Sequence, residues 1–509
     1  MISIIAVWEN RMHRRRFVSY ALVAACDFWS VIPDTGRLVA KANERQGRNT
    51  FPNPSWSPSA GEIRTISYAA GTHPLGAGAV LSEINPSRQS WNPESPRPGP
   101  YNDPDSHGYG WGTINGYSGI CWNTDTRQLV NYGAGHASIN VCAPFCFDLN
   151  DLRWKWLDTP LPFDGYGRVL TGKHSVPPSQ SVIDALYPNG EVDYSWGELN
   201  GYSPGWQMAY GPGPWLRPGK IQPIPGHTRS VLAHIPAEIL GNSKGGLFKF
   251  GAASGVLSGT RSMCSHIFDY DTKAWRRTTN PVPSFGNGVS STAQSTIVDI
   301  ETHTVIHYGG GHQFKVFDVP GESWRALRTS SNSFPGSVDT GNVLAFPPAR
   351  LLVCAFARDA SGRSAYYNGK TFAFYAVSID SVVGRGMFSI MPLTVSVASW
   401  PLNLAGNNTG IGFGYCPHDH CFYCVNGDTN STKYWKLAPP AAKTQAEYLS
   451  GTWTLSEHAF AHGSLSSPGG RSWVFNRLSW DENSRSFLWF PDAVTGPVQA
   501  FRPHGIGPG

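Results

Sequence analysis

Short apolar stretches separated by polar turns run along the chain, and they are clearest in residues 122–136 and 298–312. Each of these segments contains an apolar stretch, a tight polar turn, a second apolar stretch and a glycine-rich corner that ends in histidine. Weaker copies of the first part occur at residues 236–255, 346–356, 415–425 and 480–490. The pattern predicts pairs of antiparallel strands, each followed by a sharp change of direction.

The clearer copies of the repeat also resemble one another in the segment that follows the glycine corner. Residues 146–154, 267–275 and 316–324 each carry Phe-Asp, a turn and a tryptophan. This continuation predicts a third and a fourth strand, and a recurring unit of four antiparallel strands is typical of a β-propeller blade. We therefore predict an all-β fold: a propeller of about seven four-stranded blades over residues 101–509, with six or eight blades as alternatives.

The expected blade at residues 160–222 is the least regular, because proline, glycine and aromatic residues fill it. A long connection of this kind is typical of a functional loop. The 40 prolines and 56 glycines are otherwise spread along 509 residues without a collagen period, and 40% apolar content is too high for a disordered chain. Composition thus leaves a globular protein rich in turns.

The glycine corner, the Phe-Asp of the third strand and the tryptophan of the fourth resemble the kelch repeat of galactose-oxidase-type propellers. The resemblance covers roughly residues 110–505. It implies the propeller fold but no particular activity, because kelch propellers include enzymes, lectin-like binders and scaffolds. No cysteine and tyrosine are placed to suggest the cross-linked copper ligand of galactose oxidase, so a copper radical oxidase is the weakest functional interpretation.

The net charge of +5 arises mainly from residues 1–50, which hold eight basic and four acidic residues. The predicted propeller is therefore close to neutral, whereas a nucleic-acid-binding domain needs a basic face. We predict no nucleic-acid partner.

The amino-terminal residues 1–29 carry the order of an export signal, with arginines before a short apolar stretch and small residues before Cys26. Residues 23–26 resemble a bacterial lipoprotein lipidation box, and Arg15-Arg16 resembles a twin-arginine signal. The alternative is a buried first strand or helix. We expect export, with contact to a membrane only through a lipid anchor, and we expect residues 30–100 to pack on the propeller.

Two predicted blades end their second strand with a glycine corner and a histidine, His136 and His312. In a propeller these corners face the mouth of the central channel, where ligands usually bind. Both histidines are therefore candidate catalytic residues, although each corner can also be purely structural.

Further candidates precede the expected innermost strands. His227 and Arg229 alternate with apolar neighbours and can point to the same side of a strand. An arginine inside the channel is costly unless it meets an anion, so Arg229 is a candidate for binding a carboxylate or sulfate; the alternative is a salt bridge to a neighbouring blade.

Aromatic residues gather in the irregular stretch just before these candidates. Aromatic faces in a loop can stack on the apolar faces of sugar rings, although they can also fill the interior of a blade. The candidate base in this stretch is Tyr210, and the candidate sugar-binding residues here and at the start of an innermost strand are Tyr117, Tyr202, Trp206 and Trp215.

Nine cysteines fit an exported protein that contains disulfides, with Cys26 as the unpaired one. Five potential metal ligands fall within nine residues, namely Cys416, His418, His420, Cys421 and Cys424. Zinc accepts such a set. However, the repeat places residues 417–420 in a hairpin turn, so a disulfide between Cys416 and Cys421 is an alternative.

Histidines, tyrosines and an arginine at the mouth of an exported propeller are similar to the ulvan and oligogalacturonate lyases. This resemblance implies β-elimination next to a uronic acid: Arg229 neutralises the carboxylate, and His136 or Tyr210 removes the proton. His227 and His312 are alternative acids or bases. We expect a monomer that acts on an acidic polysaccharide and requires no cofactor, with structural zinc or calcium as an option. The alternative is a propeller that binds a glycan or a protein without catalysis.

Overall fold

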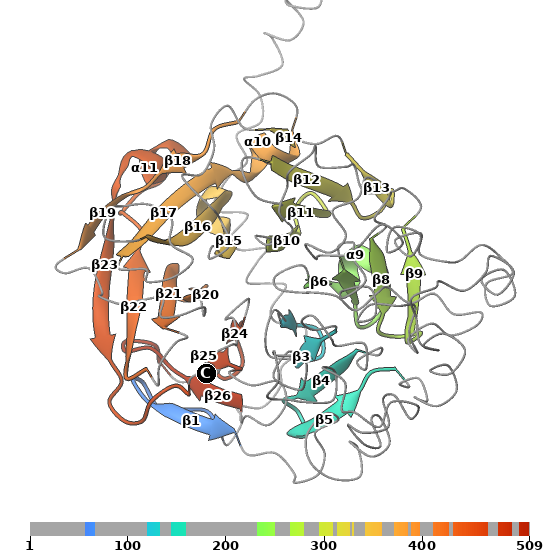
Figure 1. The fold of residues 1–509 in the computed structure, drawn as a ribbon, viewed down its shortest axis with the longest axis horizontal. Helices are drawn as coiled ribbons and strands as arrows, with labels where there is room; N and C mark the ends of the chain where they lie inside the picture. Colours follow the sequence, from blue (N-terminus) through green and yellow to red (C-terminus); the bar gives the residue numbers. More distant parts are fainter. Residues whose placement is uncertain are drawn as a thin grey trace, which may run out of the picture. The chain divides into compact units, whose positions relative to one another are not determined.

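The described residues of the computed structural model form six small, mainly antiparallel sheets, the blades of a β-propeller, within residues 51–509 (Figure 1). The structure describes residues 56–66, 120–132, 144–158, 232–249, 265–278, 295–308, 313–325, 328–329, 342–358, 371–384, 388–397, 411–426, 431–466, 477–490 and 498–507. The predicted all-β propeller is therefore confirmed.

Blades 1 to 3 follow one another in sequence, and in each the chain adds strands from the innermost outwards. Blade 1 contains β2 (Cys121–Asn123), β3 (Gln128–Asn131), β4 (Phe145–Asp148) and β5 (Arg153–Trp156). Blade 2 contains β6 (Leu232–Ile235), β7 (Gly246–Lys249), β8 (His266–Asp269) and β9 (Ala274–Arg277). Blade 3 contains β10 (Ser295–Asp299), β11 (Thr304–Tyr308), β12 (Gln313–Asp318) and β13 (Ser323–Trp324), and β14 (Arg328–Thr329) also pairs with β12.

Blades 4 and 5 repeat this order, and blade 6 differs in its outer strand. Blade 4 contains β15 (Asn342–Phe346), β16 (Leu351–Arg358), β17 (Thr371–Ser378) and β18 (Met391–Pro392). Blade 5 contains β20 (Ile411–Cys416), β21 (Cys421–Asn426), β22 (Lys433–Ala438) and β23 (Thr452–Ala459), with β19 (Thr394–Val397) added in parallel to β23. Blade 6 contains β24 (Leu478–Asp481), β25 (Ser486–Trp489), β26 (Val498–Phe501) and β1 (Ile63–Ile66).

The helices of the described residues are short and lie in connections between strands of a blade. They are α9 (Ala237–Leu240), α10 (Ile379–Val383), α11 (Gln445–Ser450) and the 3-10 turn η3 (Pro347–Ala349). Among the described residues, no helix has the length and apolar character needed to cross a membrane.

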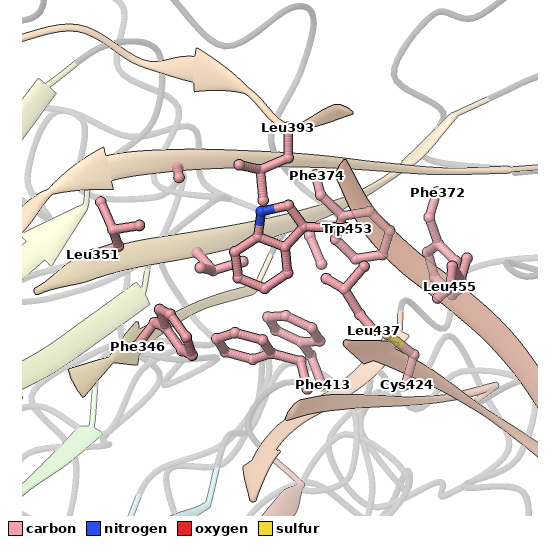
Figure 2. Close-up of a cluster of buried hydrophobic side chains, with 14 of the residues drawn as sticks. Phe346, Leu351, Phe372, Phe374, Leu393, Phe413, Cys424, Leu437, Trp453 and Leu455 are labelled. Atoms are coloured by element: carbon pink, nitrogen blue, oxygen red, sulfur yellow. The ribbon is translucent and has the colours of Figure 1, made fainter. Parts of the chain in front are cut away.

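Apolar side chains alternate between the two faces of each blade, as the period of a strand requires, and so fill the interfaces on both sides. The described core divides into six clusters, and each cluster joins two neighbouring blades. Figure 2 shows the cluster between blades 4 and 5, where Trp453 is fully buried among Phe346, Phe374 and Leu437. Interfaces of this kind hold the blades of a propeller together.

The blade count is six, and the seventh blade expected at residues 160–222 is not one of them. Cys121 and Val130 of blade 1 share one cluster with Leu247 and Phe268 of blade 2. Blades 1 and 2 are therefore direct neighbours, and no blade fits between them. Residues 159–231 lie outside the described residues.

Blade 6 is completed by the amino-terminal strand β1, which pairs with β26 from Ile63↔Phe501 to Ile66↔Val498. The cluster between blades 6 and 1 includes Ile66, Phe147 and Leu488, so the same strand also fills the interface that closes the ring. The sequence division at residue 101 did not anticipate that the preceding segment supplies a strand of a blade.

Candidate functional site

The antiparallel order of each blade gives the ring two different edges. The turns between first and second strands and between third and fourth strands lie at one edge, which we call the hairpin face. At the opposite edge, the loop face, the second strand ends, the third strand begins, and the chain passes to the next blade.

In the sequence, the predicted catalytic and sugar-binding residues fall in connections that join strand ends at the loop face. In the sequence, His136 falls between β3 and β4, His312 directly precedes β12, and His227 and Arg229 precede β6. The structure describes none of these side chains and therefore does not test their roles. The candidates outside the described residues are Tyr117, His136, Tyr202, Trp206, Tyr210, Trp215, His227, Arg229 and His312.

Buried basic residues gather on the described strand ends at the loop face. Lys249 ends β7 and lies opposite His266, the first residue of β8. His307 of β11 lies opposite Lys315 of β12 one pair from the strand end, and Arg477 directly precedes β24. Each of these five residues is at most 1% exposed, which is unusual for charged side chains.

Strand alternation shows which interfaces these side chains enter. Lys249 lies on the same side of β7 as Leu247, and Leu247 packs between blades 1 and 2. Lys315 lies on the same side of β12 as Phe317, and Phe317 packs between blades 2 and 3. Lys249 and Lys315 thus sit at the loop-face ends of two neighbouring interfaces, above their apolar clusters.

Burial changes the proton affinity of His307 and Lys315, the cross-strand pair in blade 3. It lowers the pKa of Lys315 to about 6, since a desolvated ammonium group is disfavoured. It also lowers the pKa of His307, and the nearby charge of Lys315 adds to this effect. The Oγ1 of Thr296 lies 3.0 Å from the Nδ1 of His307, which fixes the ring. At neutral pH both groups are mainly neutral, and both can take up a proton when an anion approaches.

Buried carboxylates are distributed differently. Asp148, Asp299 and Asp481 lie at the hairpin face, whereas Asp158 follows the outer strand of blade 1 at the loop face. Among the described buried charges, the loop face is therefore predominantly basic. Such an arrangement favours an anionic ligand at this edge.

Two of the hairpin-face carboxylates link blades, whereas Asp148 bonds to Gln128 and Lys155 of its own blade. Arg127 of blade 1 binds Asp481 of blade 6 through two hydrogen bonds of 3.3 and 2.8 Å. Arg350 of blade 4 binds Asp299 of blade 3 at 2.7 Å. These pairs satisfy buried charges across interfaces, which is a structural role.

The five predicted metal ligands surround the turn between β20 and β21, but they have separate partners or directions. The Nε2 of His418 lies 2.6 Å from Glu482 of blade 6, and the Nδ1 of His420 lies 2.9 Å from the hydroxyl of Tyr415. Cys416 and Cys421 pack toward blade 6, whereas Cys424 packs toward blade 4. In the described part of the chain, no three histidine, cysteine or acidic residues are grouped to hold a metal ion.

Sequence analysis missed the buried basic residues, although a signal was present. Lys249 follows Leu-Phe, His307 follows Val-Ile, and Lys315 stands between Phe314 and Val316. A charged residue inside a strand whose neighbours are apolar is a candidate for burial. Its burial could be recognised only once both faces of the blade were known to be covered.

Comparison with known proteins gives no family. No family model and no curated protein matches the chain. Many solved structures are similar to it at low level. A Bacteroides thetaiotaomicron protein of unknown function has 8% identity and a TM-score of 0.40, with 86% of this chain and 74% of that chain covered.

Two further similar structures have 9% identity and TM-scores of 0.35. One is a gluconolactonase from Xanthomonas campestris, with 76% of this chain and 87% of that chain covered. The other is an auxiliary nutrient binding protein from Bacteroides ovatus, with 76% and 69% covered. At these values the likenesses carry no information about the activity of this chain.

Proposed function

We propose that this protein is an exported, monomeric propeller that binds an acidic polysaccharide at its loop face and cleaves it next to a uronic acid by β-elimination. The observation that carries the proposal is the set of buried basic residues on the described strand ends of that face. A uronate polymer presents regularly spaced carboxylates, which match a basic edge.

The sequence supplies the proposed reacting groups in the connections between these strands. The connections that leave the described strand ends hold the candidates His136, Tyr210 and Arg229. In the proposed reaction Arg229 binds the uronate carboxylate, and this makes the proton on C5 more acidic. His136 or Tyr210 removes that proton, the C4–O4 bond breaks, a C4=C5 double bond forms, and the leaving O4 takes a proton from an acid such as His227 or His312.

The buried basic residues of the described strands support this chemistry at a distance. Those that carry a proton add to the positive potential at the edge without touching the sugar. Since Lys315 and His307 are mainly neutral at neutral pH, they can gain protons when a polyanion binds.

The test is the ultraviolet absorbance of the unsaturated uronate product while the full-length chain is incubated with a panel of uronic-acid polysaccharides. We expect absorbance to rise with the wild type and to stay flat with Arg229→Gln or His136→Ala. Arg64→Ala removes a half-exposed arginine from β1 and is the matched control that should keep full activity.

The substrate gives a second control. A polysaccharide whose carboxyl groups have been reduced to alcohols lacks both the anion and the acidified proton, and it should be neither bound nor cleaved. Binding of the uronate polymer without any double-bond product would instead establish a non-catalytic glycan-binding propeller. Absence of both binding and product across the panel would contradict the proposal.

A further inference from the structure

Two cysteines face each other at the hairpin-face end of blade 5. Cys416 is the last residue of β20 and Cys421 the first of β21, and they are direct cross-strand partners. Both side chains belong to the cluster between blades 5 and 6, so they project from the same side of the sheet. Direct cross-strand neighbours have Cα atoms about 4.5–5.5 Å apart, and this lies within the range that a disulfide spans.

The other described cysteines lack such a neighbour. Cys424 projects from the opposite side of β21, toward blade 4. Cys121 and Cys146 share a row, but β3 lies between their strands through Val130, so their Cα atoms are about 9.5 Å apart and too distant to be bridged. Cys354 packs between blades 3 and 4.

The turn between Cys416 and Cys421 is already held in place. The carboxylate of Asp419 accepts hydrogen bonds from the Tyr423 hydroxyl at 2.6 Å and from the Lys436 ammonium at 2.8 Å. The thiol of Cys421 donates to the backbone oxygen of Asp419 at 3.2 Å. The two cysteines are therefore kept in register by neighbouring contacts that do not depend on a covalent bond.

The corresponding turns of other blades begin with a different residue type. Asn123 in blade 1 and Asp481 in blade 6 stand at the equivalent position, and their side-chain oxygens accept backbone N–H groups of the turn. Blade 5 has Cys416 at that position, and it also has a cysteine at the first position of the next strand.

We propose that Cys416 and Cys421 form an intrachain disulfide when the protein meets a disulfide oxidant such as oxidised glutathione. One thiol, as thiolate, attacks glutathione disulfide and releases one glutathione, giving a mixed disulfide. The other thiol then attacks the protein sulfur and releases the second glutathione. In total, two protein thiols and one glutathione disulfide become one protein disulfide and two glutathione molecules.

Burial determines when this exchange occurs. Both thiols are almost fully buried in this structure, which holds them as free cysteines. Burial raises the pKa of Cys421 to about 12 and that of Cys416 further, so the attacking thiolate is scarce once blade 5 is packed. The disulfide therefore forms while the hairpin assembles, and it forms only slowly in the finished fold.

The consequence reaches beyond the hairpin. The same turn carries His418, whose ring contacts Glu482 of blade 6. A closed turn limits the conformations that this ring can take before blades 5 and 6 pack together. The disulfide is thus expected to strengthen the interface as well as the hairpin.

The experiment is refolding of the full chain from denaturant in a glutathione redox buffer, followed by alkylation of free thiols under denaturing conditions and peptide mass mapping. We expect the tryptic peptide that contains all three cysteines of blade 5 to carry one alkyl group, on Cys424. Its mass should be 2 Da below that of the same singly alkylated peptide with Cys416 and Cys421 as thiols. After reduction and a second alkylation the peptide should carry three alkyl groups. Adding the same oxidant to protein that was folded under reducing conditions should give this product much more slowly.

Variants test which cysteines pair. Cys424→Ser removes the neighbour on the opposite face and should leave the disulfide intact, whereas Cys416→Ser and Cys421→Ser should each abolish it. Circular dichroism checks that each variant folds, and the wild-type map decides the matter even if one does not. Full alkylation of all three cysteines after oxidative refolding, or a disulfide that includes Cys424, would overturn the proposal.

Discussion

At the scale of single residues, the described structure separates two kinds of buried charge. Arg127 and Asp481 are both almost completely buried and bind each other across the interface between blades 6 and 1. Lys249, Lys315 and Arg477 are equally buried at the opposite edge of the ring. The first kind closes the ring, and the second kind lies at the described strand ends of the loop face.

The Arg127 pair allows a direct prediction about stability. Arg127→Ala leaves Asp481 buried without its main cationic partner, so the free energy of unfolding should fall by about 3–5 kcal/mol. Urea unfolding followed by tryptophan fluorescence measures this change. Arg64→Ala removes an exposed arginine and should cost less than about 1 kcal/mol. Equal effects of the two substitutions would show that the buried pair does not stabilise the closure.

Lys315 predicts how stability depends on pH. Its folded pKa of about 6 lies below its ordinary value of 10.5, so the unfolded chain binds more protons between these two values. The free energy of unfolding should therefore rise as pH increases from about 6 toward about 10. The same gain in stability is lost when pH falls back through this range. Lys315→Met should flatten the rise when urea midpoints are measured across this range. His307, whose pKa is also lowered, acts only below about pH 6.5 and does not confuse the comparison. An unchanged slope in Lys315→Met would show that the lysine stays charged in the fold.

At the scale of elements, β1 has the most specific role. The burial of its residues does not follow simple alternation along the strand. Arg64 and Thr65 are both exposed, whereas Ile66 is fully buried. Ile66 also packs in the cluster that joins blades 6 and 1. Ile63, which is partly buried, packs against the cluster between blades 5 and 6. Both isoleucines of this short strand therefore connect the amino-terminal segment to the core, and Ile66 is the fully buried one.

Ile66→Ala should reduce the free energy of unfolding by about 2–5 kcal/mol, because it leaves a cavity in a packed interface. Thr65→Ala changes the neighbouring exposed residue on the same strand and is the matched control, with an expected effect within about 0.5 kcal/mol. Thermal unfolding of both variants measures the difference. If both lose the same stability, strand pairing rather than interface packing would be the contribution of β1.

At the scale of the whole molecule, the proposed function depends on the summed charge of one edge. Association with a uronate polymer should weaken as salt is added, because added ions screen the exposed carboxylates of the polymer from the positive potential of the edge beyond about 8–10 Å at physiological ionic strength. Binding measured by fluorescence titration at increasing sodium chloride tests this prediction. A carboxyl-reduced polymer serves as the control. Affinity that does not change with salt would indicate recognition through apolar stacking instead.

Much of the fold could be predicted from the sequence because a blade is built from local hairpins. The strand, turn and strand pattern of residues 298–308 became β10 and β11, and the Phe-Asp that follows became the end of β12. The kelch identity of the repeat, the roles of His136 and Arg229, and the export signal stay predictions, because no described residue tests them.

The sequence by itself determined the strands, their tight turns and the all-β propeller class, since these follow from hydrogen bonding and apolar alternation between near neighbours. Only the tertiary structure decided the number of blades, the use of Ile63–Ile66 as the last outer strand, and the separation of Cys424 from Cys416 and Cys421. These features depend on contacts between residues far apart in the chain and on which side of a blade faces which neighbour. Local pattern carries no information about such contacts, because they exist only after the ring has closed.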